Sequence, residues 1–166
     1  MLERELKVVE DYMFIQQMRF GRRVVYESRL ELDPGTVMIP AFTLQPLVEN
    51  AVIHGLAKKE EGGRVFLRVW EKDGCAVISV ADTGAGMSRE RYEELCRALE
   101  ESCEKGSRTS KTGIGLGNIY RRVHTMYADG QVRIVSTPGR GTVVQMSIPQ
   151  EREEGEEQDV SGTDRR

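Results

Sequence analysis

The sequence predicts an α+β domain, and three observations lead to that class. Helical and strand patterns follow each other without the strict alternation that is typical of a doubly wound sheet. Short turns at Asp73-Gly74 and at residues 138–141 each join two strand patterns. The chain has 166 residues, of which 39% are hydrophobic, and this is enough for one sizeable core.

Residues 1–20 carry an amphipathic helical pattern that Gly21 is expected to end. Val8, Tyr12 and Ile15 widen its apolar face. The stripe itself consists of Leu2, Leu6, Val9 and Met13. Two interpretations stay open: the helix packs only on its own domain, or it continues into a partner-binding segment. Residues 24–32 then alternate as a strand does.

Residues 39–59 contain the second helical pattern. Thr43 is the expected N-cap, which places Pro46 in the first turn, where a missing N–H group is tolerated. Asn50 and His54 are four residues apart and share a face other than the core stripe. That stripe consists of Leu44, Leu47, Val48 and Ala51.

The rest of the chain contains four strand patterns and two helical patterns. The strands are expected at residues 64–70, 75–82, 131–138 and 141–149. The helices are expected at residues 88–105, with Tyr92, Leu95, Cys96 and Leu99 as the stripe, and at 118–127, with Ile119, Val123 and Met126 facing inward. The glycine- and serine-rich segment 106–118 precedes the last helix.

Composition excludes several classes of function. The net charge of −3 and the pI of about 5.6 give no basic field for nucleic acid. There is no signal peptide and no 18-residue apolar run. No Cys/His cluster predicts a zinc site, so Cys75, Cys96 and Cys103 are read as reduced thiols of a cytosolic protein. Residues 151–166 are acidic and are expected to be disordered.

Three polar or glycine-rich islands interrupt the apolar pattern. The first lies on a helix, the second follows a buried strand, and the third precedes a helix. They are Glu49-Asn50 with His54, Asp82-x-Gly84-x-Gly86, and Gly113-x-Gly115-x-Gly117.

The third island suits an anion. Alternating glycines expose backbone N–H groups, and a following helix N-terminus adds partial positive charge, so the island could bind phosphate. The alternative is an ordinary glycine loop before a helix. Residues 106–112 resemble a P-loop, but they are one residue short, lack the second glycine and follow a helix. The dinucleotide fingerprint also fails, because the island reads GxGxG and no strand precedes it.

Asp82 and Asn50 each allow a structural and a functional reading. An ionised Asp82 only accepts hydrogen bonds, so it suits an exocyclic amine such as that of adenine, with Gly84 and Gly86 leaving room for a flat base. The alternative for Asp82 is a surface Asx turn. The amide oxygen of Asn50 suits a Mg²⁺ shell, and its alternative is a hydrogen-bonded structural role.

The order "PLVENAVIHG", "DTGAGM", "TGIGLGN" and "TPGRGTVVQMSIP" resembles the nucleotide-binding domain of sensor histidine kinases, within the GHKL ATPase superfamily. The islands correspond to its N box and its two glycine boxes. The stretches "YMFIQQMRFGRR" and "LQPLVENA" are similar to the LytS-like group. The resemblance spans residues 3–150. It implies a two-layer α/β sandwich of the Bergerat type, with a mixed, mostly antiparallel sheet and helices on one face.

The resemblance also implies roles for single residues, with ATP and Mg²⁺ as the ligands. Asn50 would hold Mg²⁺, Asp82 would accept from the adenine amino group, and Thr142 would support that end. His54, Gly84 and Gly86 would lie at the nucleotide. Residues 88–112 would form a mobile lid. The residues expected to wrap the phosphates are Gly113, Gly115, Leu116 and Gly117.

Two departures from the family pattern bear on activity. Ile53 stands where the family often has a lysine near the phosphates, so His54 or an arginine is the expected replacement. The phosphoacceptor histidine of the group lies in an upstream motif that this sequence lacks. His54 is expected at the nucleotide, and His124 is expected to be structural.

The resemblance therefore implies the catalytic domain of a histidine kinase, transferring the γ-phosphoryl group of ATP to a histidine on an absent upstream segment. Residues 1–20 would link to that dimerising segment, residues 21–150 would form the ATPase domain, and residues 151–166 the tail. A response regulator and a membrane-associated homodimeric parent, with this part cytoplasmic, are the implied context. A free-standing GHKL ATPase is disfavoured by Pro46, where those enzymes have a carboxylate; a degenerate nucleotide-binding module is favoured only by Ile53.

Overall fold

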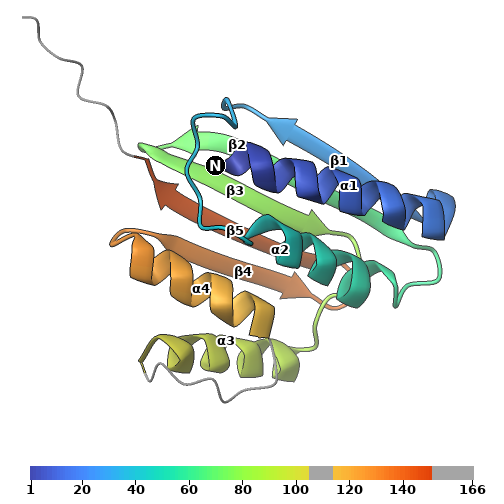
Figure 1. Ribbon diagram of the computed structural model, residues 1–166. Coiled ribbons are helices and arrows are strands. Elements are labelled where there is room, and N and C mark those ends of the chain that lie inside the picture. Colours follow the sequence, from blue (N-terminus) through green and yellow to red (C-terminus); the bar gives the residue numbers. More distant parts are fainter. Residues whose placement is uncertain (105–113, 151–166) are drawn as a thin grey trace, which may run out of the picture.

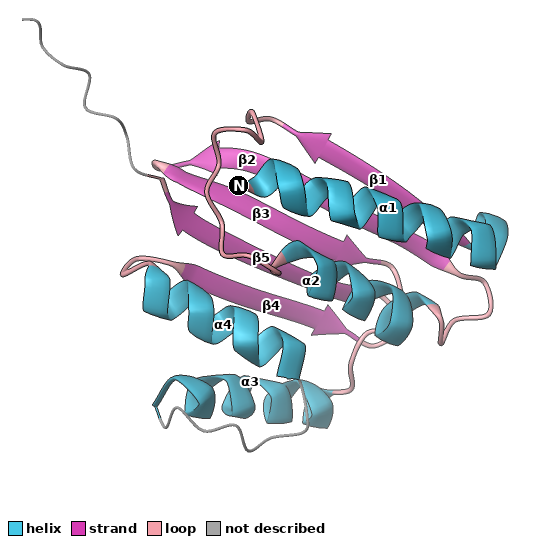
Figure 2. Cartoon of the chain, viewed as in Figure 1, coloured by secondary structure: helices cyan, strands magenta, loops and turns pink. Residues whose placement is uncertain are grey.

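The computed structural model describes residues 1–104 and 114–150, in which one five-stranded sheet carries helices over one face (Figures 1 and 2). The predicted α+β class is confirmed. The elements are α1 (Leu2–Phe20), a 3₁₀ turn η1 (Gly21–Arg23), β1 (Val24–Leu30), α2 (Leu44–Asn50) with its π-helical continuation η2 (Ala51–Leu56), β2 (Gly63–Lys72), β3 (Cys75–Asp82), α3 (Arg89–Glu104), α4 (Ile114–Met126), β4 (Gln131–Thr137) and β5 (Gly141–Pro149).

The sheet is mixed and mostly antiparallel, as predicted. Its strand order is β1-β2-β3-β5-β4, and only the β1–β2 pair is parallel. Asp73 and Gly74 join β2 to β3 with φ values of 52° and 76°, which is the geometry of a type I′ hairpin turn. β3 lies at the centre of the sheet, and its carboxyl end carries Asp82.

The core lies between the sheet and the helices. The helix-facing side of the strands buries apolar residues at alternate positions, as a half-covered sheet requires. Both the α1 stripe and the α2 stripe predicted from spacing are buried. The largest of the fully buried side chains include Leu2, Met13, Leu44, Leu67, Ile78, Ile119, Met146 and Ile148.

One prediction about the helices is wrong, and a second is right in position only. Met126 is exposed rather than inward-facing, because Tyr127, just after the end of α4, packs against the core four residues after Val123. Thr43 is the N-cap residue of α2, as predicted, but its side chain makes no capping hydrogen bond. Its hydroxyl donates to the carbonyl of Pro40, and the carboxylate of Glu5 accepts the backbone N–H groups instead.

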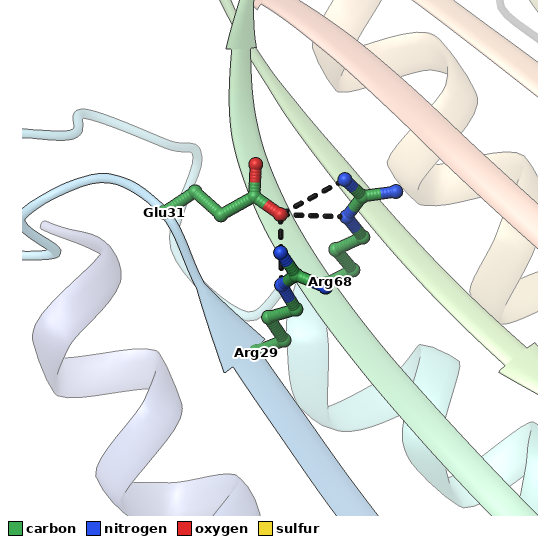
Figure 3. Close-up of polar contacts among 3 residues, drawn as sticks. All are labelled: Arg29, Glu31 and Arg68. Carbon is green, nitrogen blue, oxygen red and sulfur yellow. Dashed lines mark hydrogen bonds and ion pairs between the residues drawn. The ribbon is translucent and has the colours of Figure 1, made fainter.

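The opposite face of the sheet carries charged side chains (Figure 3). Arg29 on β1 lies beside Arg68 on β2, and Glu31 accepts from both guanidinium groups at 3.0 Å and 2.8 Å. Arg68 also lies over the ring of Trp70, 4.8 Å from its centroid. These pairs are exposed, so each contributes at most about 1 kcal/mol, and their main effect is to offset the repulsion between neighbouring arginines.

None of the helices within residues 1–104 and 114–150 combines the length and the apolar character needed to cross a bilayer. Residues 151–166, predicted to be a disordered tail, lie outside the described residues. So do residues 105–113, which include Gly113 and most of the glycine- and serine-rich segment.

Candidate functional site

A cavity of about 560 Å³ lies between α2–η2, the ends of β3 and β5, and the first turns of α3 and α4. This volume is in the range of small-molecule sites. All three islands of the sequence reach it, through Asn50 and His54, through Asp82, and through Gly115. Residues more than sixty positions apart therefore meet at one place, which no local pattern requires.

Asp82 is the buried carboxylate of the cavity. It ends β3 and is 8% exposed, on the same face of the sheet as Val80. Its Oδ1 accepts the N–H of Gly84 at 2.8 Å, which is an Asx turn, and the N–H of Thr142 also donates to it. Burial raises the pKa of Asp82 above its ordinary value of 3.8, while these two backbone bonds oppose the shift.

The two readings of Asp82 are therefore compatible. The Asx turn exists, but it is buried in the cavity wall rather than placed on the surface. A carboxylate offers about four acceptor sites, so two backbone donors leave capacity for a ligand donor. Among residues 1–104 and 114–150, no cationic side chain forms an ion pair with Asp82. A carboxylate kept buried in this way is a candidate for function on physical grounds.

Gly55 and Gly84 bring the helix and the strand end into backbone contact. A Cβ at Gly84 would lie 2.3–2.5 Å from the backbone of Gly55, and a Cβ at Gly55 would lie 2.6 Å from Oδ1 of Asp82. The N–H of Ala85 donates to the carbonyl of Gly55 at 3.1 Å. Gly84 is thus required by contacts within the chain, whatever its relation to a ligand.

Gly86 and Gly141 form a second close approach. A Cβ at Gly86 would lie 2.0 Å from the carbonyl oxygen of Thr137, and one at Gly141 would lie 1.9 Å from that of Asp82. Both residues have positive φ, of 65° and 104°. Nearby, the hydroxyl oxygens of Ser136 and Thr142 lie 2.8 Å apart, so Thr142 is oriented at the cavity wall.

Asn50 and His54 belong to the helix that forms another wall of the cavity. α2 is α-helical to Asn50 and then widens into the π-helical turn η2, which carries His54 and Gly55. π-helical turns are rare and are often found at functional sites. Asn50 is half-buried and His54 is exposed, and both line the cavity. Glu49 instead accepts a hydrogen bond from Gln45 at 2.8 Å.

The first turn of α4 forms the third wall. α4 begins at Ile114, so Gly115, Leu116 and Gly117 belong to the helix, and the prediction that they precede it is wrong by four residues. A Cβ at Gly115 would lie 3.7 Å from Nδ2 of Asn50. The backbone N–H groups of a first helical turn have no partner within the helix, so this turn still suits an anion beside Asn50.

The charges around the cavity also suit an anion. Asp82 is the only carboxylate among the lining residues that the structure describes, whereas Lys58 and Arg91 add two cations. Ile53 is 53% exposed and is not among the lining residues. Positive charge at this site therefore comes from Lys58 and Arg91 rather than from position 53.

Seven of the ten residues predicted to bind nucleotide line this cavity. Gly84 and Gly117 are described but do not line it, and Gly113 lies outside the described residues. The lining residues are Asn50, His54, Asp82, Gly86, Gly115, Leu116 and Thr142. Sequence reasoning missed Gly55 and Lys58, and it expected an arginine in place of the family's lysine without identifying Arg91. Gly55 had a signal, as a glycine inside a helical pattern.

Metal ligands are sparse. In the described part of the chain, no three His, Cys, Asp or Glu side chains lie close enough to hold an ion. Mg²⁺ nevertheless needs only one or two protein oxygens when phosphates and water complete its shell. The half-buried amide of Asn50, beside the helical turn at Gly115, fits that limited requirement.

Comparisons with known proteins agree with this geometry. Residues 40–152 match the family described as histidine kinase-, DNA gyrase B-, and HSP90-like ATPase. The chain is 34% identical over 160 residues to the sensor protein LytS of Bacillus anthracis, covering 96% of this chain and 26% of that protein. The chain thus spans about a quarter of the length of this relative.

Solved structures share the fold. The blue-light activated histidine kinase EL346 of Erythrobacter litoralis superposes with a TM-score of 0.60 at 18% identity, covering 90% of this chain and 42% of that one. Full-length ShkA in complex with AMPPNP gives a TM-score of 0.58 at 22% identity, covering 90% and 30%. The chain belongs to the histidine kinase-, DNA gyrase B- and HSP90-like ATPase family.

Proposed function

We propose that this chain is the catalytic domain of a sensor histidine kinase, which binds Mg-ATP and presents its γ-phosphoryl group to a histidine elsewhere in the parent protein. One observation supports this above the others. The cavity of about 560 Å³ combines a buried carboxylate, which lies against Gly55 and Gly141, with an amide near the first turn of α4. We call the part of the cavity at Asp82 the base end and the part at Asn50 and Gly115 the phosphate end. A purine with an exocyclic amine and a chain of phosphates has that same division of chemistry.

Each end then has its own task. Asp82 accepts from the adenine amino group, and Thr142 and Gly86 line the wall beside the base. The first turn of α4 binds the phosphates, with Lys58 and Arg91 adding positive charge and His54 lining the same cavity. Asn50 holds Mg²⁺, which neutralises phosphate charge. Transfer breaks the bond between the γ-phosphorus and the ADP oxygen while an imidazole nitrogen bonds to phosphorus.

The base assignment is tested with two nucleotides that differ at one group. ATP carries an amino group at C6 and inosine triphosphate carries a carbonyl, which a carboxylate repels. We expect calorimetric titration to show ATP binding and weaker inosine triphosphate binding, and Asp82→Asn to lose about 1–3 kcal/mol for ATP. Asp73→Asn, in the hairpin turn at the other end of β3, is the matched control. Equal affinity of Asp82→Asn and wild type for ATP would remove this role.

Kinase activity needs a separate test. Incubation with radiolabelled ATP and the upstream segment of the parent protein, supplied in trans, should label a histidine of that segment in an acid-labile form. Binding of ATP without such labelling would favour the degenerate signalling module, for which the exposed Ile53 is the one supporting observation. The response regulator and the membrane-associated homodimeric parent remain part of this proposal.

A further inference from the structure

The turn at the start of α2, residues 41–44, is held from two sides by charged side chains of other helices. This segment, the 41–44 turn, leads directly into the helix that carries Asn50 and His54. Its backbone N–H groups face α1, and its backbone carbonyl groups face α4. The local sequence supplies no side-chain cap, because the hydroxyl of Thr43 donates to Pro40.

Glu5 of α1 supplies the missing acceptors. One carboxylate oxygen accepts the N–H of Phe42 at 2.8 Å, and the other accepts those of Thr43 and Leu44 at 2.9 Å and 3.1 Å. Glu5 is half-buried, and hydrogen bonds to an ionised acceptor are stronger than neutral ones. α2 is therefore capped by a residue almost forty positions earlier in the chain.

Arg122 of α4 binds the carbonyl side of the same turn. Its guanidinium donates to the carbonyl oxygens of Ala41 and Phe42, while its Nε donates to Asn118 within α4. Between these two contacts Phe42 has a φ of 56° and a side chain that is 70% exposed. A non-glycine residue in that conformation is strained and persists only where its surroundings hold it.

The helices joined at this turn are those that line the phosphate end of the cavity. α2 carries Asn50, and the first turn of α4 carries Gly115 and Leu116. Asp82, in contrast, is held by β3 and by the backbone of Gly84 and Thr142. A change at the 41–44 turn should consequently move the phosphate end and leave the base end in place.

We propose that Glu5 is a positioning residue that, together with Arg122, sets the placement of α2 and α4 at the phosphate end of the cavity and so couples α1 to nucleotide binding. This inference rests on the proposed function, because its main test measures the affinity for ATP. Displacement of α1 withdraws the carboxylate from three backbone N–H groups at once, which releases the start of α2.

The test compares Glu5→Ala with Glu3→Ala, which removes the same charge from an exposed position two residues away. Affinity for ATP is measured by calorimetry, both with Mg²⁺ and with EDTA. We expect Glu5→Ala to weaken Mg-ATP binding at least about tenfold, as removal of an outer-shell partner does, and binding in EDTA much less. Glu3→Ala should stay within about twofold of wild type in both conditions.

Further variants separate positioning from loss of the fold. Glu5→Gln keeps one acceptor oxygen, so it should stay folded and fall between wild type and Glu5→Ala. Arg122→Ala should resemble Glu5→Ala, with Arg121→Ala as its matched control, and the double variant should lose less than the sum because both side chains act on one turn. Equal losses with and without Mg²⁺, or no loss, would overturn the proposal.

Amide hydrogen exchange gives a readout that does not need the ligand. Exchange over residues 44–56 should be faster in Glu5→Ala than in Glu3→Ala, while β3 stays protected in both. If wild type binds no nucleotide, the proposed function fails, and this comparison alone then decides whether Glu5 holds α2. Equal exchange rates in the two variants would overturn that claim.

Discussion

The two ends of the cavity are built in different ways. At the base end, Asp82 and four glycines meet through backbone contacts, and the carboxylate is 8% exposed. At the phosphate end, the half-buried amide of Asn50 lies near the first turn of α4, and the exposed side chains of His54, Lys58 and Arg91 line the same cavity. One end is fixed by the fold itself, whereas the other depends on how two helices are placed.

Under the proposed function, this difference has a physical basis in the group that each end would recognise. Discrimination of one base from another needs a polar group held rigidly in a dry place, since a mismatched buried partner is then costly. Phosphates carry high charge and are bound by many donors of low specificity, so mobility of any one donor costs less binding free energy. Substitutions of the closely packed glycines at the base end should accordingly cost more stability than substitutions at the phosphate end.

The largest expected effect is at Gly141. Alanine there would place a Cβ 1.9 Å from the carbonyl oxygen of Asp82, at a φ of 104° that side chains rarely adopt. We expect Gly141→Ala to lower the free energy of unfolding by about 3 kcal/mol, the sum of overpacking and backbone strain. Urea denaturation followed by circular dichroism measures it.

Gly139 is the matched control for this substitution. It has a φ of 74° in the same turn, but a Cβ there would meet nothing within 4 Å. Gly139→Ala should cost only the strain, about 1 kcal/mol. Similar losses for the two variants would show that the close approach to Asp82 does not rigidify the base end.

The raised pKa of Asp82 predicts opposite pH dependences for stability and for binding. Burial favours the protonated form in the folded state, so the contribution of Asp82 to stability is present at low pH and is lost as pH rises from 3.8 through the raised pKa. Binding of the adenine amino group needs the ionised form, so affinity for ATP should fall about tenfold per pH unit below that pKa. Urea denaturation and ATP titration at several pH values, with Asp82→Asn as a reference, measure the stability and the affinity. A difference between the two proteins that does not change with pH would contradict the prediction.

Local patterns predicted much of the fold because local physics determines it. Cys75–Asp82 and Gly141–Pro149 were predicted to the residue, since apolar runs bounded by turn residues leave few alternatives. The Asp73-Gly74 turn was predicted because this pair of residues tolerates the two positive φ values that such a turn needs. The buried stripe of α1 followed from helical spacing alone.

The features that escaped prediction depend on distant residues. Glu5 caps α2 from a position almost forty residues earlier in the chain, so no short stretch of sequence contains both partners. The need for glycine at position 55 becomes clear only from its contact with Gly84. The cations at the cavity come from two distant parts of the chain, Lys58 just after η2 and Arg91 on α3. The nucleotide roles of the predicted residues stay predictions, although seven of them meet at one cavity.

Gly117 lets stability and binding be separated at the phosphate end. It lies in the first part of α4, and a Cβ there would meet nothing within 4 Å. Gly117→Ala should raise the free energy of unfolding by about 0.5–1 kcal/mol, because alanine loses less backbone entropy in a helix. If the phosphates approach this backbone closely, affinity for Mg-ATP should fall in the same variant. A variant that is less stable than wild type would contradict the open space seen at this position.

The smallest expected effect is at Ile53, where the family often has a lysine. Because Ile53 is 53% exposed and does not line the cavity, Ile53→Lys should change the free energy of unfolding by no more than about 0.5 kcal/mol. An exposed cation near the phosphates contributes at most about 1 kcal/mol, so affinity for Mg-ATP should rise by about threefold or less. Met126→Lys, a similar charge change on an exposed residue of α4, is the control. A rise of tenfold or more in Ile53→Lys alone would mean that position 53 reaches the phosphates, and that the placement of α2 in the free domain differs from its placement with nucleotide bound.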